Sequence, residues 1–138
     1  MILFFEHCER MIDFYNRTVN KVAMKHDITF MEFTVLMFLS NNPEYDTASE
    51  IVKYRHLSKS HVSMSLKTLL QKNMIEIIID DIDHRVSHIK LLPNTKVITD
   101  EGRVAQKEFF EAVFKGFEEK DFEKLKQYII QINNNKCR

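Results

Sequence analysis

Small polar and basic side chains gather along one side of a helix that the sequence predicts over residues 58–72. In an α-helical projection this side carries Ser60, His61, Met64, Lys67 and Thr68. Hydroxyl groups can hydrogen-bond to phosphates or bases, and lysine or protonated histidine can donate to phosphate or guanine. We therefore expect this side of the helix to form a surface that reads a nucleic acid.

The opposite side of the same helix is apolar and should face a core. Its stripe consists of Val62, Leu66, Leu69 and Leu70. Ser58 is a good N-cap because its hydroxyl can accept a hydrogen bond from a free helix N–H group. Asn73 tolerates the left-handed conformation that closes a helix. The sequence thus predicts both ends of the helix and the face that it buries.

The charges around this helix are segregated. Between Ile51 and Ile75 the sequence has no Asp or Glu. The same stretch holds five basic residues and two histidines, namely Lys53, Arg55, Lys59, Lys67, Lys72, His56 and His61. One face of this region should therefore be basic, as a phosphate-binding surface must be.

The elements that position these residues follow one another in a recognisable order. The sequence predicts a helix over 47–54, a turn over 55–57, the helix over 58–72, a strand over 75–79, an acidic tip over 80–83 and a returning strand over 85–91. Helix, turn, helix and hairpin in this order are typical of a winged helix-turn-helix. In that fold the second helix enters the DNA major groove and the hairpin reaches the flanking backbone.

Three segments carry a resemblance to a known family. They are the run Leu57 to Ser63, the segment Lys72 to Glu76, and the motif Asp80-x-x-Asp83-x-Arg85. These segments resemble the recognition helix and wing of the MarR family of bacterial transcriptional regulators. The likeness extends from Ile28 to Ile132. It implies a homodimer whose N- and C-terminal helices interlock, and a wing in which an acidic residue holds the tip while Arg85 reaches toward the minor groove.

The candidate site residues follow from the polar face and the resemblance together. DNA contacts are expected from Ser58, Lys59, Ser60, His61, Met64, Lys67, Thr68, His84 and Arg85, and a wing-stabilising role from Asp80 and Asp83. The chain departs from the family pattern at Met64, where many relatives have Arg, at Ile77, where a basic residue usually stands, and at Pro93-Asn94. These departures concern DNA affinity and target sequence more than the fold.

Composition sets broader limits. The chain has 138 residues, 44% of them hydrophobic, which is enough for one core. Lys and Arg number 20, as do Asp and Glu, so the formal net charge is zero and only the local segregation favours a nucleic acid. Cys8 and Cys137 show no paired spacing, which favours a reducing cytoplasm. No apolar run reaches the roughly 20 residues that span a bilayer, so we expect a soluble cytoplasmic protein without a membrane partner.

The sequence predicts helices with an apolar stripe at both ends of the chain. They cover residues 2–25, residues 93 to about 115, and residues 119–132, and a polar tail over 133–138 should be frayed. Val97, Val104, Phe109, Ala112 and Val113 should supply apolar contacts of the middle helix. A further helix, capped by Thr29 and Glu32 and ended by Asn41-Asn42-Pro43, is apolar nearly all round and should be the centre of the core. We expect a dimerisation helix over 1–26, a DNA-binding region over 27–92 and dimerisation helices over 93–138.

The resemblance also implies a small-molecule effector, for which the candidate residues are Met11, Tyr15, Phe30 and Met37, all equally suited to the core.

The six histidines form no tight ligand motif, so no metal or cofactor is expected. Cys8 lies in an apolar stripe, which favours a buried structural thiol over a reactive one. The sequence has no catalytic motif and only two glycines, so it does not indicate an enzyme.

The prediction is a mainly helical protein with a small β-hairpin wing and a helical dimerisation region built from both chain ends. Its function would be that of a homodimeric repressor that binds a palindromic operator in double-stranded DNA and is released by a small-molecule effector. Two alternatives remain open. One is a winged-helix interaction dimer with weak or no DNA binding, and the other is a redox- or metal-responsive regulator.

Overall fold

The central helix of the molecule is α2 (Phe30–Asn41), which is buried over most of its length. Its eight residues from Glu32 to Leu39 are all buried. Thr29 caps the helix: its hydroxyl accepts from the Glu32 N–H, and the Glu32 carboxylate accepts from the Thr29 N–H. An apolar helix with no polar side must be covered by other elements on every side. The predicted capping box and central position of this helix are confirmed.

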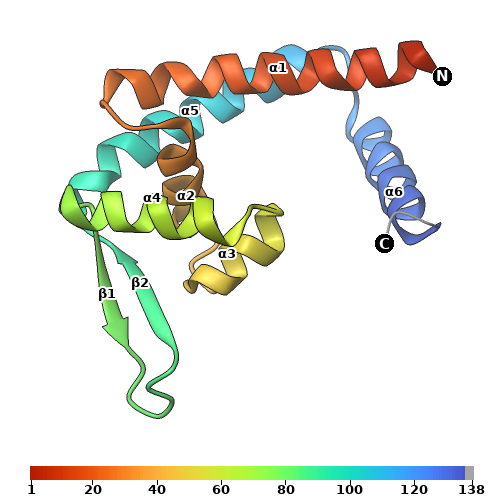
Figure 1. Ribbon diagram of the computed structural model, residues 1–138. Helices are drawn as coiled ribbons and strands as arrows, with labels where there is room; N and C mark the ends of the chain where they lie inside the picture. The colour runs from red at the N-terminus through yellow and green to blue at the C-terminus, as the bar shows by residue number, and fades with distance from the viewer. Residues whose placement is uncertain (136–138) are drawn as a thin grey trace.

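The other elements of the computed structural model, which describes residues 1–135, surround α2 (Figure 1). They are α1 (Ile2–Lys25), α3 (Ala48–Arg55), α4 (Lys59–Gln71), β1 (Ile75–Ile79), β2 (Ser87–Leu91), the 3₁₀ turn η1 (Pro93–Thr95), α5 (Lys96–Val113) and α6 (Glu119–Asn135). The strands pair antiparallel, with Ile75 opposite Leu91 and Ile79 opposite Ser87. The molecule is therefore mainly helical with one hairpin, as predicted.

Several predicted boundaries need correction. The second strand begins at Ser87 and not at Arg85, because the turn that closes the wing includes residues 80–86. The last helix continues to Asn135, so the tail expected to fray from residue 133 is helical as far as that residue. The rest of that tail, with Cys137, lies outside the described residues. Pro93 opens the 3₁₀ turn that precedes α5 and not the α-helix itself.

α1 and α5 lie side by side over α2 (Figure 1). Gly102 allows α5 to approach α2 closely, since a Cβ at this position would collide with the Met37 sulfur and lie 3.0 Å from the Phe33 ring, both on α2. Lys25 and His26 at the end of α1 both contact the Glu101 carboxylate, at 2.8 and 2.9 Å. These contacts tie the end of α1 to α5.

Within residues 1–135, two predicted sets of apolar contacts are made only in part. Val97, Val104 and Ala112 lie exposed on α5, Val113 is half-buried, and Leu70 on α4 is also exposed. The buried face of α5 consists instead of Ile98, Thr99, Gly102, Ala105 and Phe109. The neighbouring helices therefore cover a narrower apolar stripe of α5 than the sequence pattern predicted. Of the apolar residues predicted for α5, only Phe109 is buried.

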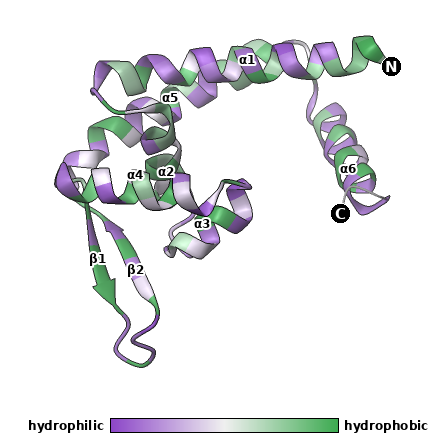
Figure 2. Ribbon diagram, viewed as in Figure 1, coloured by the Kyte–Doolittle hydropathy of each residue, from purple (hydrophilic) through white to green (hydrophobic). Residues whose placement is uncertain are grey.

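Both ends of the chain expose large apolar side chains. The first half of α1 has no buried residue, and Phe4, Phe5 and Ile12 are exposed there. α6 has no buried residue at all and hangs from the end of α5, apart from the central unit (Figure 1). Figure 2 shows that hydrophobic residues alternate with hydrophilic ones along both helices. In the described chain, no helix is both long enough and apolar enough to cross a membrane.

Candidate nucleic-acid interface

α4 is held against the core by its apolar stripe and begins at a capped end. The Ser58 hydroxyl accepts a hydrogen bond from the His61 N–H at 3.2 Å, as predicted. Val62, Leu66 and Leu69 are buried against the core, joined by Ser65 in place of Leu70. Asn73 adopts a left-handed conformation with φ of 54°, which ends the helix where the sequence indicated. The burial of this side turns the other side of α4 outward.

The outward side of α4 is the polar face that the sequence singled out. Ser60, His61 and Lys67 are exposed, and Met64 exposes 65% of its surface. Thr68 is half-buried, and its hydroxyl donates to the Met64 carbonyl at 3.0 Å. Ser58 and Lys59 at the start of the helix are also exposed. The structure therefore brings the predicted helix residues together on one accessible surface, with Thr68 at its margin.

Two of the five basic residues counted for this surface point elsewhere. Lys72 turns back to the core, where its ammonium group lies 3.1 Å from the Glu32 carboxylate and donates to the Asp27 carbonyl at 3.0 Å. Arg55 lines a cavity beside α2. The basic character of the outer surface therefore rests on Lys53, Lys59 and Lys67, and the wider basic face inferred from the sequence is corrected to this extent.

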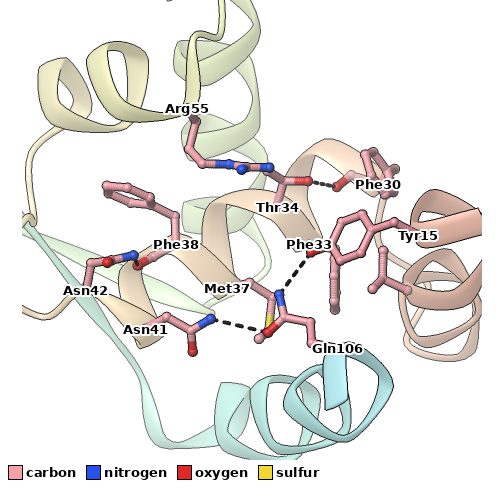
Figure 3. A pocket seen from close by; sticks show the side chains of 11 residues that line it. Tyr15, Phe30, Phe33, Thr34, Met37, Phe38, Asn41, Asn42, Arg55 and Gln106 are labelled. Atoms are coloured by element: carbon pink, nitrogen blue, oxygen red, sulfur yellow. Dashed lines mark hydrogen bonds between the residues drawn. The ribbon is translucent and has the colours of Figure 1, made fainter. Parts of the chain in front are cut away.

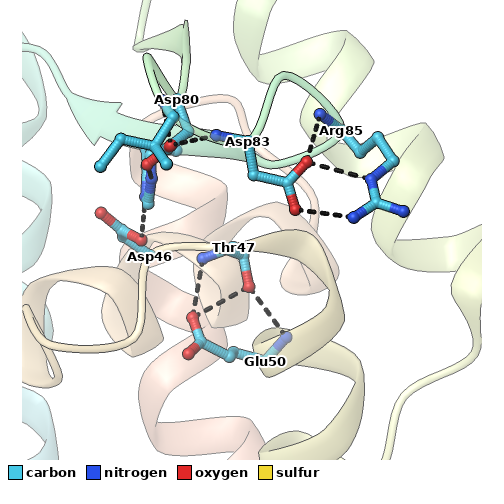
Figure 4. A network of polar contacts seen from close by, with 8 residues as sticks. Asp46, Thr47, Glu50, Asp80, Asp83 and Arg85 are labelled. Atoms are coloured by element: carbon cyan, nitrogen blue, oxygen red, sulfur yellow. Dashed lines mark hydrogen bonds and ion pairs between the residues drawn. The ribbon is translucent and has the colours of Figure 1, made fainter.

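The wing tip is closed by its two predicted acidic residues (Figure 4). One Asp80 oxygen accepts from the N–H groups of Ile82 and Asp83, both at 2.8 Å. Asp83 binds Arg85 through both oxygens, at 3.0 and 3.1 Å from the guanidinium nitrogens. The guanidinium lowers the pKa of Asp83, and the carboxylate raises the pKa of Arg85. Because 89% of the Arg85 side chain remains exposed, it is oriented by Asp83 without being buried.

A histidine that the sequence did not single out ties the wing to the loop before α3. The two ring nitrogens of His88 lie 2.7 Å from an Asp46 oxygen and 3.0 Å from the second Asp80 oxygen. Only the protonated ring can donate to both carboxylates, so the two acidic residues raise the pKa of His88, Asp46 foremost. The backbone N–H of Asp83, followed by His88, lowers the pKa of Asp80 to about 2. No local motif signals this contact, since Asp46 is 42 residues from His88.

Comparison with known proteins agrees with this geometry. Residues 26–85, which contain α2 to the wing tip, match the model of the MarR family. The winged helix-turn-helix of this chain is thus similar to that of the MarR family. Members of this family are transcriptional regulators. No curated protein sequence matches the chain.

Solved structures of MarR proteins share the whole fold at low sequence identity. A MarR regulator from Silicibacter pomeroyi is 17% identical, with a TM-score of 0.79 over 94% of this chain and 86% of that one. One from Methanosarcina mazei is 16% identical, with a TM-score of 0.77 over 97% and 96%. MepR of S. aureus, solved as a DNA complex, is 19% identical, with a TM-score of 0.77 over 96% and 92%. The MarR fold thus includes the terminal helices of this chain.

Three of the four candidate effector residues line one cavity. Tyr15, Phe30 and Met37 surround a space of about 100 Å³ beside α2 (Figure 3), whereas Met11 lies outside this lining. Polar groups stand at its edge: Gln106 donates to the Tyr15 hydroxyl at 3.0 Å and accepts from the Asn41 amide at 3.3 Å. The cavity is enclosed by α1, α2 and α5 together with Arg55 from α3. The cavity therefore lies between the terminal helices α1 and α5 and the winged-helix elements α2 and α3.

The remaining candidate residues are placed as follows. His84 is exposed at the wing tip beside Arg85. Cys8 is half-buried on α1, where a buried thiol was expected. Within residues 1–135 no group of three or more His, Cys, Asp or Glu side chains could hold a metal ion.

Proposed function

We propose that this protein is a homodimeric, sequence-specific regulator that binds double-stranded DNA. The observation that carries the proposal is the exposed, carboxylate-free face of α4, which is bordered by Lys59 and Lys67 on one flank and by His61 on the other. An α-helix fits the major groove, where hydroxyl and basic side chains meet base edges and phosphates. The wing supplies a second contact, because Asp83 holds the exposed Arg85 guanidinium in a fixed direction.

The dimer is part of the same proposal. α6 is an amphipathic helix whose apolar residues, among them Phe122, Ile129 and Ile132, are exposed in the single chain. Such a helix gains its stability chiefly from packing an apolar face against a partner. Phe4, Phe5 and Ile12 on α1 offer a second uncovered apolar surface. We propose that residues 1–26 and 93–138 of two chains cover these surfaces mutually, and that residues 27–92 form the DNA-binding region.

A two-fold dimer would present two copies of α4. They should read two half-sites of a palindromic operator that are separated by one DNA turn, about 34 Å, or by a multiple of it.

We propose that the protein acts as a repressor and that a small-molecule effector releases it. The cavity beside α2 supports an effector site, although its volume is below the roughly 300 Å³ of a common ligand pocket. An effector would have to widen it, and widening would move α1 and α5 relative to the winged helix. The effect is limited by the preference of the ligand for the widened state.

Fluorescence anisotropy with DNA from the promoter of its own operon tests the proposal. Affinity should fall steeply as salt rises, with a log–log slope of about 0.9 for each phosphate contacted. Lys59→Ala should weaken binding and lower this slope by about one contact. Lys107→Ala, a change at an exposed lysine of α5, serves as the control. Binding that neither depends on salt nor responds to Lys59→Ala and Arg85→Ala would favour the interaction dimer instead.

A further inference from the structure

An open apolar groove lies between α3, α4 and the first strand of the wing. Its volume is about 620 Å³, within the range of pockets that hold small molecules. Apolar side chains from all three elements line it, among them Val52, Val62, Leu66, Leu70 and Ile77. Leu70 and Ile77 are exposed there although both are large and apolar. Figure 2 shows the same hydrophobic character along much of β1.

The rim of this groove is positively charged. Lys53 stands on the α3 side, and Lys59 and Lys67 stand on the α4 side. Among residues 1–135, the ion pairs do not include any of these three lysines. Glu50 is on α3, but its carboxylate accepts hydrogen bonds from the N–H and hydroxyl of Thr47 (Figure 4). The groove therefore combines an apolar floor with positive charge that no acidic group of the described chain offsets.

The groove is elongated. Its α4 wall runs from Lys59 to Leu70, and the eleven helical rises between these residues, at 1.5 Å each, give a length of about 16 Å. Such a length suits an extended hydrocarbon chain better than a single ring. An apolar chain would contact the floor, while an anionic end group would pair with the lysines on the rim. A neutral or cationic end group would leave the rim without a partner.

We propose that this groove binds a medium- or long-chain carboxylate, with its alkyl chain against Leu70 and Ile77 and its carboxylate at the lysine rim. The regulatory consequence rests on the proposed DNA-binding function. Lys59 and Lys67 belong to the α4 surface proposed to meet DNA, so a bound carboxylate competes with DNA phosphates for them. The ligand acts at the reading surface itself, separately from the cavity beside α2.

Calorimetric titration of the full-length protein with dodecanoate, below its micellar concentration, tests the binding step. Saturable binding of one dodecanoate per chain is expected, with 1-dodecanol weaker by about fivefold because it lacks the charge. Ile77→Glu should weaken dodecanoate binding by about tenfold, because it places a carboxylate among the alkyl contacts. Ile79→Glu is the matched control, since Ile79 is exposed on the same strand outside the groove. Circular dichroism establishes that both variants are folded.

Two results would overturn the binding site. The first is the absence of saturable dodecanoate binding, and the second is unchanged binding by Ile77→Glu, which would place the ligand elsewhere. Anisotropy with operator DNA then tests competition: dodecanoate should release DNA from the wild type and from Ile79→Glu at similar concentrations, and from Ile77→Glu only at about tenfold higher concentration. If dodecanoate binds in the groove and the protein binds no DNA, the proposed function fails and the ligand site stands. If DNA binds normally and dodecanoate does not bind, the ligand site fails and the proposed function stands.

Discussion

The ammonium group of Lys72, at the end of α4, lies 3.1 Å from the carboxylate of Glu32, at the start of α2. Glu32 is only 4% exposed in its side chain, whereas Lys72 is 35% exposed. The same carboxylate accepts from the Thr29 N–H in the capping box. One buried acidic group thus joins the first turn of α2 to the end of α4. This ion pair adds to the apolar contacts that hold α4 against the core.

Lys72→Met should therefore lower the free energy of unfolding by about 2 kcal/mol, because it leaves the buried Glu32 carboxylate without its cation. Urea denaturation at neutral pH measures this. Lys67→Met, an exposed change on the same helix, should leave stability within about 0.5 kcal/mol and weaken DNA binding instead. Equal destabilisation by both variants would contradict the assigned roles.

The link between His88, Asp46 and Asp80 predicts a pH-dependent wing. Because the folded protein raises the pKa of His88 above its ordinary value of 6.5, the protonated ring stabilises the folded state fully below that value. This contribution is lost as the pH rises through the folded pKa. NMR titration of the His88 ring should give a pKa above 6.5, and Asp46→Asn should lower it. A His88 pKa at or below 6.5 would show that the contact does not persist in solution.

The contribution of Asp80 to the stability of the folded state depends on pH in the opposite direction to that of His88. Its folded pKa of about 2 lies below its ordinary value of 3.8, so its contribution is present above 3.8 and is lost as the pH falls through about 2. Asp80→Asn should remove this dependence. Unfolding measured between pH 2 and 5 checks the prediction, with Asp81→Asn, at an exposed neighbour, as the control.

Arg85 and Asp83 should differ in their effects on DNA binding. Arg85→Ala should weaken operator binding by about tenfold, because it removes the guanidinium that we propose contacts the minor groove. Asp83→Ala should weaken it less, because the guanidinium remains but loses the carboxylate that orients it. Anisotropy titrations of both variants at one salt concentration compare them. A larger loss for Asp83→Ala would assign the wing mainly a structural role.

Gly102→Ala should destabilise the protein by about 1–3 kcal/mol, since the added methyl group meets the Met37 sulfur and the Phe33 ring in a packed core. Thermal unfolding measures the change. Glu111→Ala, at an exposed position of the same helix, should leave the unfolding temperature nearly unchanged. An unchanged or raised temperature for Gly102→Ala would mean that α2 and α5 can separate at little cost.

Ile129→Glu should give single chains by light scattering at micromolar concentration, where the wild type should give two-chain particles. The change places a carboxylate on the apolar side of α6 that we propose to be covered in the dimer. Gln127→Glu adds the same charge at another exposed position of α6 and should leave the dimer intact. Single chains in the wild type would remove the dimer from the proposed function.

The sequence by itself determined the order, type and approximate bounds of the elements and the outward face of α4. These features depend on short-range physics: hydrophobic periodicity, a capping box at Thr29, a cap at Ser58 and a left-handed Asn73 all act within a few residues. The wing motif was equally local, because Asp80, Asp83 and Arg85 satisfy one another within one turn.

The tertiary structure decided which charged groups remain free for a ligand. Thr47 caps α3, whereas its neighbour Asp46 pairs with His88, which lies 42 residues further along the chain. Lys72 pairs with a carboxylate 40 residues away, and the groove beneath Lys53, Lys59 and Lys67 exists only where two helices and a strand converge. Such pairings depend on three-dimensional distance, which no spacing along the chain specifies.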